Sequence, residues 1–207
     1  MAIETSETPT PMSSETPRKK SGSVGRWLIE WAIILVLVVG FTFVLRTFVI
    51  QTFSIPSGSM LPTLHVGDRI IVNKLSYDFH DVHRGDIVVF KRPPLESQNY
   101  SDLVKRVVGL PGETISSVNG KIYINGKLLT VPWLPPGPQD FTGPLASDAH
   151  PQFNMPGPVK IPAGEYYVMG DNRTDSEDSR FFGPIPKSLI VGRAVAVVWP
   201  VSRIKGL

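Results

Sequence analysis

The chain has 207 residues, of which 42% are hydrophobic and 19% charged, so it is long enough to bury a substantial core. Its 21 basic and 18 acidic residues give a net charge of +3. The basic residues are scattered along the chain, without a basic stripe interleaved with aromatics, which argues against nucleic-acid binding. The chain has no cysteine, which excludes disulfides, thiolate metal sites and a cysteine nucleophile.

The N-terminal part consists of a polar tail followed by a long apolar run. Residues 1–25 are rich in Ser, Thr, Pro and Glu, and we expect them to be disordered. The run from Trp27 to Leu45 has Glu30 as its only charge and is close to the ~20 residues that a bilayer span requires. We therefore predict a transmembrane helix and membrane-proximal segment over 26–50. A cleaved signal peptide is the alternative, but the run is long for one and no A-x-A cleavage site follows.

The charges around the apolar run predict its orientation. Basic residues precede it at Arg18, Lys19, Lys20 and Arg26. By the positive-inside rule, we expect a single-pass protein of the cell membrane with a cytoplasmic N-terminus and everything after Arg46 extracytoplasmic. An extended chain of ~3.6 Å per residue keeps Ser59 within roughly 50 Å of the bilayer. The aromatic residues of 47–53 suggest that this stretch follows the membrane or extends the helix.

The remainder is predicted to be mainly β, because 20 prolines and 18 glycines leave little room for further long helices. Short β-branched or aromatic runs bounded by Gly, Pro or Asn indicate strands within 67–75, 85–93, 101–115, 121–124, 164–172 and 189–200. Two Asn-Gly pairs flank the run KIYI and predict hairpin turns. Between Pro132 and Pro158 lie eight prolines, which indicate an extended loop.

The stretch IPSGSMLPTL contains a candidate nucleophile, Ser59. A serine beside a glycine is usually a turn residue, but here Pro56 and Pro62 restrict the backbone on both sides and Gly58 permits a close approach. Such a loop can present the Ser59 hydroxyl and its N–H together. A serine hydroxyl is a weak nucleophile until a base takes its proton, so the sequence must also supply a base.

Lysine is a better candidate base here than histidine. The four histidines, at 65, 80, 83 and 150, have no evident orienting carboxylate, and metal binding by the pair at 80 and 83 has equally little support. Lysine can act as a base when burial lowers its pKa. Strand alternation puts Lys105 on the face of Leu103 and Val107, so it is the best-buried candidate. The local pattern alone favours the alternative, a lysine that extends from a sheet edge into solvent.

A third polar stretch, residues 169–186, has the length and charge of a calcium loop. Arg173 occupies a position where an EF-hand needs an oxygen ligand, so the spacing does not fit calcium. A turn held by Asp178 and Arg180, with the hydroxyls of Ser176 and Ser179 available to orient another group, accounts for the same residues. We expect no metal.

Four motifs behind the apolar run resemble those of bacterial type I signal peptidases, which are membrane-anchored serine proteases with a Ser-Lys dyad. They are PSGSMLPTL, GDRIIVNKL, KRVVGLPGE and GDNRTDSEDSR, and they occur in that family's order. The resemblance implies a mostly antiparallel β-sheet catalytic core over 51–112 and 166–207. It also implies a smaller inserted β subdomain, here 113–165, where relatives differ most.

The resemblance also implies roles for individual residues. Ser59 would attack the scissile carbonyl and Lys105 would act as general base, with the Ser59 N–H and the Ser57 hydroxyl as oxyanion hole. Ser176 would position the lysine, supported by Asp178 and Arg180. The apolar residues that would form shallow pockets for small side chains such as Ala, one and three positions before the cut, are Phe53, Ile55, Met60, Leu103 and Val104.

The implied function is removal of N-terminal signal peptides from exported preproteins, without a cofactor. The expected partners are preprotein signal peptides and the lipid bilayer. One alternative within the enzymes is a self-cleaving Ser-Lys protease like the SOS repressors, although a membrane anchor in place of a DNA-binding domain argues against it. From another class, the chain could be a non-enzymatic anchored β domain that scaffolds a secretion or envelope complex.

Overall fold

The computed structural model describes residues 24–44, 46, 49–94, 100–118, 121–134 and 158–207. The chain divides into two compact units, Met1–Thr42 and Phe43–Leu207. The expectations for the tail and for nearly all of the proline-rich loop lie outside the described residues.

Helix α1 spans Val24–Val44, and its stretch Gly25–Phe43 is long and apolar enough to cross a membrane. Large apolar side chains on every side of this helix, such as Leu37 and Phe41, are exposed. A helix that is apolar all round needs an apolar environment, which a bilayer provides.

Of the two alternatives for residues 47–53, extension of the helix is wrong for residues 50–53, because Ile50–Ser54 forms strand β1. It runs antiparallel to β2 (Arg69–Asn73), with Ile50 opposite Asn73 and Ser54 opposite Arg69. The same apolar and aromatic residues that suggested a membrane contact are good strand formers.

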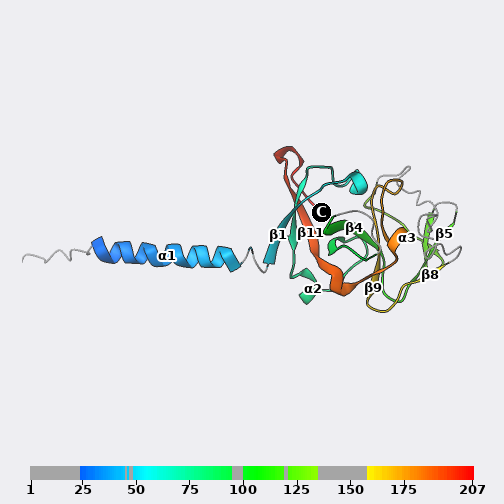
Figure 1. Ribbon diagram of the computed structural model, residues 1–207, viewed down its shortest axis with the longest axis horizontal. Helices are drawn as coiled ribbons and strands as arrows, with labels where there is room; N and C mark the ends of the chain where they lie inside the picture. Colours follow the sequence, from blue (N-terminus) through cyan, green and yellow to red (C-terminus); the bar gives the residue numbers. More distant parts are fainter. Residues whose placement is uncertain (1–23, 45, 47–48, 95–99, 119–120, 135–157) are drawn as a thin grey trace, which may run out of the picture. The chain divides into compact units, whose positions relative to one another are not determined.

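The main sheet confirms the mainly β, antiparallel fold class. Its strand order is β1-β2-β11-β3-β4-β9-β10, with β12 paired to β11 (Figure 1). The bounds of the strands after β2 are Ile87–Lys91 for β3, Asp102–Gly109 for β4, Glu165–Met169 for β9, Ile185–Pro186 for β10, Ile190–Trp199 for β11 and Lys205–Gly206 for β12.

Strand β3 shows how the core forms on both faces of this sheet. Ile87 and Val89 pack into one buried cluster together with Met60, whereas Val88 and Phe90 pack into another. Each cluster takes alternate residues of the strand, as the two-residue period of a β-strand requires. Strands β3 and β4 are therefore held from both sides, which makes β4 a rigid support for its side chains.

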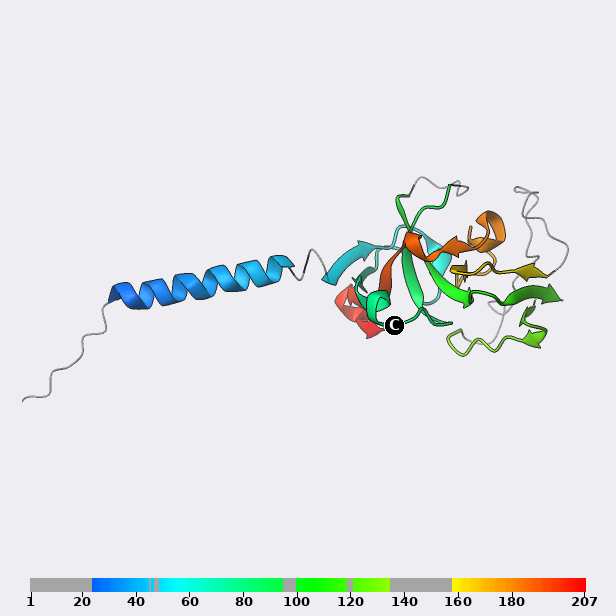
Figure 2. The ribbon, with the colours of Figure 1, turned by 90° about the horizontal axis from the view of Figure 1, so that it is seen from below.

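A second, four-stranded sheet has the order β7-β6-β5-β8. Its strands are β5 (Thr114–Val118), β6 (Lys121–Ile124), β7 (Lys127–Leu128) and β8 (Val159–Lys160). It lies at the end of the β domain opposite β1, in green and yellow in Figure 2. A buried cluster that includes Ile115, Ile161 and Tyr167 joins it to β9. The subdomain boundaries given above stay a prediction.

Turn chemistry explains one connection in the second sheet. Asn125 and Gly126 link β6 to β7, and both have positive φ, at 51° and 77°. This is the backbone that a two-residue hairpin turn requires and that Asn-Gly adopts easily, as expected from the sequence. The other Asn-Gly pair, 119–120, lies outside the described residues.

The structure adds short helical turns that the sequence analysis did not predict. They are α2 (Ser76–Phe79), α3 (Ser179–Phe182), and the 3₁₀ turns η2 (Gly58–Met60), η5 (Lys187–Leu189) and η6 (Val201–Arg203). Elements of three or four residues are too short to produce an apolar period in a sequence.

Candidate active site

Ser59 lies in turn η2, within the loop 55–64 that we call the nucleophile loop. The turn is closed by Leu61 N–H donating to the Gly58 carbonyl at 3.1 Å, and Leu64 N–H donates to the Met60 carbonyl at 2.9 Å. Ile55 before the turn and Leu64 after it are buried in the same core cluster, which anchors the loop on either side of the turn. Ser59 is therefore held in a fixed position and is only 8% exposed.

Lys105 reaches Ser59 from strand β4. Its Nζ donates to Ser59 Oγ at 2.8 Å, although the two residues are 46 positions apart in the chain. Lys105 is 3% exposed, so the alternative of a lysine extending into solvent is wrong. Leu103 and Val107, two positions to either side, share one buried cluster, as strand alternation predicted. Excluding water from an amine disfavours its charged form, which suits a proton acceptor.

Ser57 is the second hydroxyl beside the nucleophile. Its Oγ donates to Ser59 Oγ at 3.3 Å, and both serines line the same pocket. The Ser57 hydroxyl therefore lies beside the Ser59 hydroxyl at the pocket wall.

The loop 170–180 holds the nucleophile turn from the other side. Asn172 N–H donates to the Ser59 carbonyl at 3.0 Å, and Asn172 Nδ2 donates to the Gly58 carbonyl at 3.1 Å. Asn172 belongs to the motif GDNRTDSEDSR, but no role was predicted for it from the sequence. The polar composition of the motif was the only signal, because the partner lies more than a hundred residues away.

Gly170 allows the 170–180 loop to pass directly beside the nucleophile. A Cβ at this position would lie 2.5 Å from both the Ser59 carbonyl oxygen and Ser176 Cβ, and closer still to Ser176 Oγ. Ser176 therefore lies close to the Ser59 main chain, while its expected role of positioning Lys105 stays a prediction. Its Oγ is buried and has no hydrogen-bond partner among the described residues, so it can bond to a group that moves in during a reaction.

Asp178 and Arg180 form the ion pair that fixes this loop. Arg180 donates to Asp178 from Nε at 2.8 Å and from Nη2 at 2.9 Å, and Gly170 N–H donates to Asp178 Oδ2 at 2.9 Å. Burial alone would raise the pKa of Asp178, but the charge and hydrogen bonds of Arg180 outweigh it and hold that pKa below its usual range. Asp178 also caps α3 by accepting from Arg180 N–H.

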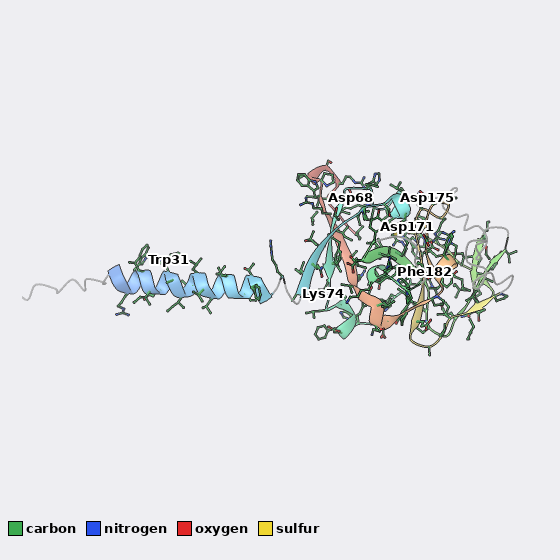
Figure 3. All side chains as sticks on the ribbon, in the orientation of Figure 1. Trp31, Asp68, Lys74, Asp171, Asp175 and Phe182 are labelled. Carbon is green, nitrogen blue, oxygen red and sulfur yellow. The ribbon has the colours of Figure 1, made fainter. Side chains whose placement is uncertain are left out.

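A second buried ion pair, absent from the predicted site, joins β4 to the same loop. Arg106 donates to Asp171 from Nε at 2.8 Å and from Nη2 at 2.7 Å, and it donates to the Gly85 carbonyl from Nη1 at 2.7 Å. Asp171, labelled in Figure 3, is fully buried. Arg106 directly follows the lysine in sequence, and this adjacency was the only signal for it.

Arg173 completes a cluster of buried charges in the loop. Its Nε and Nη2 are buried without a hydrogen-bond partner in the part of the chain that the structure describes, and burial lowers its pKa. Its carbonyl accepts from Arg180 Nη1 at 2.6 Å. The loop that resembled a calcium site in length and charge is thus held by arginine–aspartate pairs.

One pocket of about 190 Å³ opens in front of Ser59 and Lys105. All five residues predicted for the substrate pocket line it, together with Ser54, Pro56, Ser57, Tyr100, Ser101 and Asp102. One wall comes from β1 and the nucleophile loop, and the other from the start of β4 and the residues before it. A peptide entering here would lie between two chain segments with the Ser59 hydroxyl at its side.

The histidines are placed away from this chemistry. His65, His80 and His83 are exposed and none lines the pocket, while the remaining histidine lies outside the described residues.

Comparisons with known proteins agree with these features. The family model described as "Signal peptidase, peptidase S26" matches residues 28–199. Signal peptidase I of Leptolyngbya laminosa is 44% identical over 164 residues, covering 77% of this chain and 74% of the relative. A probable signal peptidase I-2 of Synechocystis sp. is 38% identical over 192 residues, covering 92% and 82%. Signal peptidase I of Bacillus caldolyticus is 39% identical over 186 residues, covering 90% and 95%.

Proposed function

The chain belongs to the signal peptidase family, peptidase S26, and is a serine peptidase that removes signal peptides; we propose that Ser59 is its nucleophile and Lys105 its general base. The 2.8 Å contact between Lys105 Nζ and Ser59 Oγ, in a site where both residues are buried, carries this proposal. Strand β4 brings the amine, and the nucleophile loop brings the hydroxyl.

The first chemical step is acylation of Ser59. The neutral amine of Lys105 accepts the hydroxyl proton while Ser59 Oγ attacks the scissile carbonyl of the preprotein. The resulting ammonium then donates this proton to the departing amine, which breaks the peptide bond and releases the mature chain. Water, activated by the same amine, hydrolyses the ester between Ser59 and the signal peptide.

The Ser59 N–H and the Ser57 hydroxyl are proposed to bind the oxyanion of each tetrahedral intermediate. Ser57 Oγ lies 3.3 Å from Ser59 Oγ and lines the pocket, which supports its position near the developing charge. Removal of one such donor costs ~3 to 4 kcal/mol of transition-state stabilisation in serine proteases.

Ser176 is proposed to position the Lys105 amine, with Asp178 and Arg180 supporting it. The buried and unpartnered Ser176 hydroxyl supports this role, because the ammonium that forms during acylation needs an acceptor. Asp178 is fully buried, and its charge interacts favourably with Lys105. The ion pair with Arg180 offsets the negative charge of Asp178, so that this carboxylate stabilises the charged ammonium form of Lys105 less strongly.

The pocket is proposed to select small side chains one and three positions before the cut. Its walls include the apolar residues Ile55, Leu103 and Val104, and its volume of about 190 Å³ is small for a peptide site. This size fits the A-x-A end of secretory signal peptides. The substrate class is therefore exported preproteins.

Helix α1 is proposed to anchor the enzyme in the cell membrane as a single span, with the N-terminus in the cytoplasm and the β domain outside. The basic residues before the helix support this orientation. Anchoring would bring the dyad to signal peptides that are themselves still in the bilayer.

Cleavage of a preprotein in detergent micelles tests the dyad. We expect Ser59→Ala and Lys105→Ala each to abolish cleavage while circular dichroism shows a folded protein. Lys127→Ala is the matched control, because this exposed lysine in the second sheet should be dispensable. Retention of cleavage by both dyad variants would refute the proposal and favour the scaffold alternative.

A further inference from the structure

Trp133 lies in the connection between strands β7 and β8 of the smaller sheet, but its ring packs against residues of the main sheet and its approach, Arg106 and Gly85. The Arg106 Cζ lies 5.5 Å from the centre of the Trp133 ring, which is a cation–π contact. The same ring lies against Gly85, where a Cβ would be 3.2 Å from Trp133 Cε3 and Cζ3. The indole thus covers both the Arg106 guanidinium and the backbone whose carbonyl accepts from Arg106.

The covered guanidinium connects three parts of the active site. It belongs to β4, directly after Lys105, and it holds Asp171 of the 170–180 loop through two hydrogen bonds. Its Nη2 also lies 3.5 Å from Thr63 Oγ1 in the nucleophile loop. The position of Arg106 therefore influences the strand that carries the base and both loops that meet at the nucleophile.

Asp171 connects the Arg106 guanidinium to the residues that contact the Ser59 carbonyl. It stands between Gly170, which lies against the Ser59 carbonyl, and Asn172, whose N–H donates to that carbonyl. Arg106 is only 6% exposed. With the indole removed, water would reach the guanidinium and compete for its hydrogen bonds, and the loop would be held less firmly.

We propose that Trp133, in the connection between β7 and β8, is a positioning residue that excludes water from the Arg106–Asp171 pair and so fixes Ser59 against Lys105. This inference rests on the proposed roles of Ser59 and Lys105. Trp133 does not line the pocket in front of Ser59, and its proposed effect passes through Arg106. A connection of the smaller sheet would thereby be tied to the geometry of the dyad.

The test compares kcat, KM and melting temperature for preprotein cleavage by Trp133→Phe, Trp133→Leu and Trp133→Ala. Loss of a desolvated cation–π contact corresponds to about tenfold in rate. We expect Trp133→Ala to lower kcat by about tenfold with KM changed less than about twofold, and Trp133→Phe to keep kcat within about threefold because it retains an aromatic face. Trp133→Leu, which keeps the apolar cover alone, should fall between them.

Two controls separate positioning from general destabilisation. Leu134→Ala removes a buried neighbour in the same turn and should lower the melting temperature without lowering kcat. In an Arg106→Met background, Trp133→Ala should cause no further loss of kcat, because its effect passes through that guanidinium.

Additive losses in the Arg106→Met background would overturn the inference, as would a Phe variant as slow as the Ala variant. If Trp133→Ala does not fold, the kcat of Trp133→Leu is the test, and a kcat equal to that of wild type in Trp133→Leu overturns the inference. None of these outcomes touches the dyad, which Ser59→Ala and Lys105→Ala test separately.

Discussion

Gly170 offers a direct test of how closely the dyad geometry is set. In Gly170→Ala, the new methyl group would lie 2.5 Å from the Ser59 carbonyl oxygen and from Ser176 Cβ. Ordinary contacts of this kind are about 3.4 Å or longer, so the two segments must separate by roughly 1 Å. Because one of the neighbours is backbone, a side-chain rotation cannot relieve the contact.

The expected loss can be estimated from this displacement. Overpacking of a tight site costs about 1–3 kcal/mol of stability. Misplacement of a catalytic group by about 1 Å costs on the order of 100-fold in rate. We therefore expect the kcat of Gly170→Ala for preprotein cleavage to fall on the order of 100-fold, while the protein remains folded at room temperature. Single-turnover cleavage and thermal unfolding measure the two effects.

A matched control is available at Gly109, where an added Cβ would collide with the Ile161 side chain and lie 3.0 Å from Tyr167 Cβ. This contact is in the core between the two sheets, so Gly109→Ala should lower stability comparably with little change in kcat. A kcat for Gly170→Ala within about threefold of wild type would refute the reasoning.

Two further outcomes follow from the charges and the pocket. The pKa of Asp178 is lowered in the folded state, so its stabilising effect is complete above its unfolded pKa of about 4 and is lost as the pH falls through the folded value. Asp178→Asn should therefore lower the free energy of unfolding at neutral pH. The difference in this free energy between variant and wild type, measured by urea titration, should shrink below about pH 4. A difference that does not change with pH would contradict this reasoning. Val104→Ala enlarges the pocket and should raise kcat/KM for preproteins with Val one or three positions before the cut, relative to Ala, and unchanged selectivity would remove Val104 from the proposed pocket.

The sequence was sufficient where the signal is local. Prolines around Ser59 indicated a fixed loop, and alternation in β4 made Lys105 the best-buried candidate among the lysines. The local pattern still favoured a side chain extending into solvent, and the structure shows that Lys105 is buried. The apolar helix and most strands follow from composition and short runs of β-branched residues. That the serine and lysine meet could not be read from their neighbourhoods, because their contact spans 46 residues of chain. The family resemblance supplied this pairing.

The parts that could not be predicted depend on contacts between distant segments. Arg106 and Asp171 are 65 residues apart, and nothing near either one specifies its partner. Gly170 owes its importance to the approach of Ser59 and Ser176, which becomes visible only once the loops are placed. Residues 47–53 were ambiguous for another reason, since apolar and aromatic residues suit a membrane contact, an extended helix and an edge strand. Pairing with β2 shows that Ile50–Ser54 is a strand, and a contact of this stretch with the membrane stays a prediction.

Two adjacent cationic residues on β4 illustrate why residue type matters at this site. Lys105 and Arg106 are both buried, so each must either be neutralised or paired. A lysine amine can lose its proton under desolvation, whereas a guanidinium remains charged in proteins and suits a two-pronged bond to a carboxylate. Accordingly, the lysine contacts an alcohol at 2.8 Å and the arginine contacts Asp171 through two nitrogens. If the two residues were exchanged, an arginine that stays charged would lie beside Ser59, and Asp171 would be paired with a lysine, which has only one nitrogen to offer. The order Lys-Arg along the strand therefore specifies which residue can act as the base.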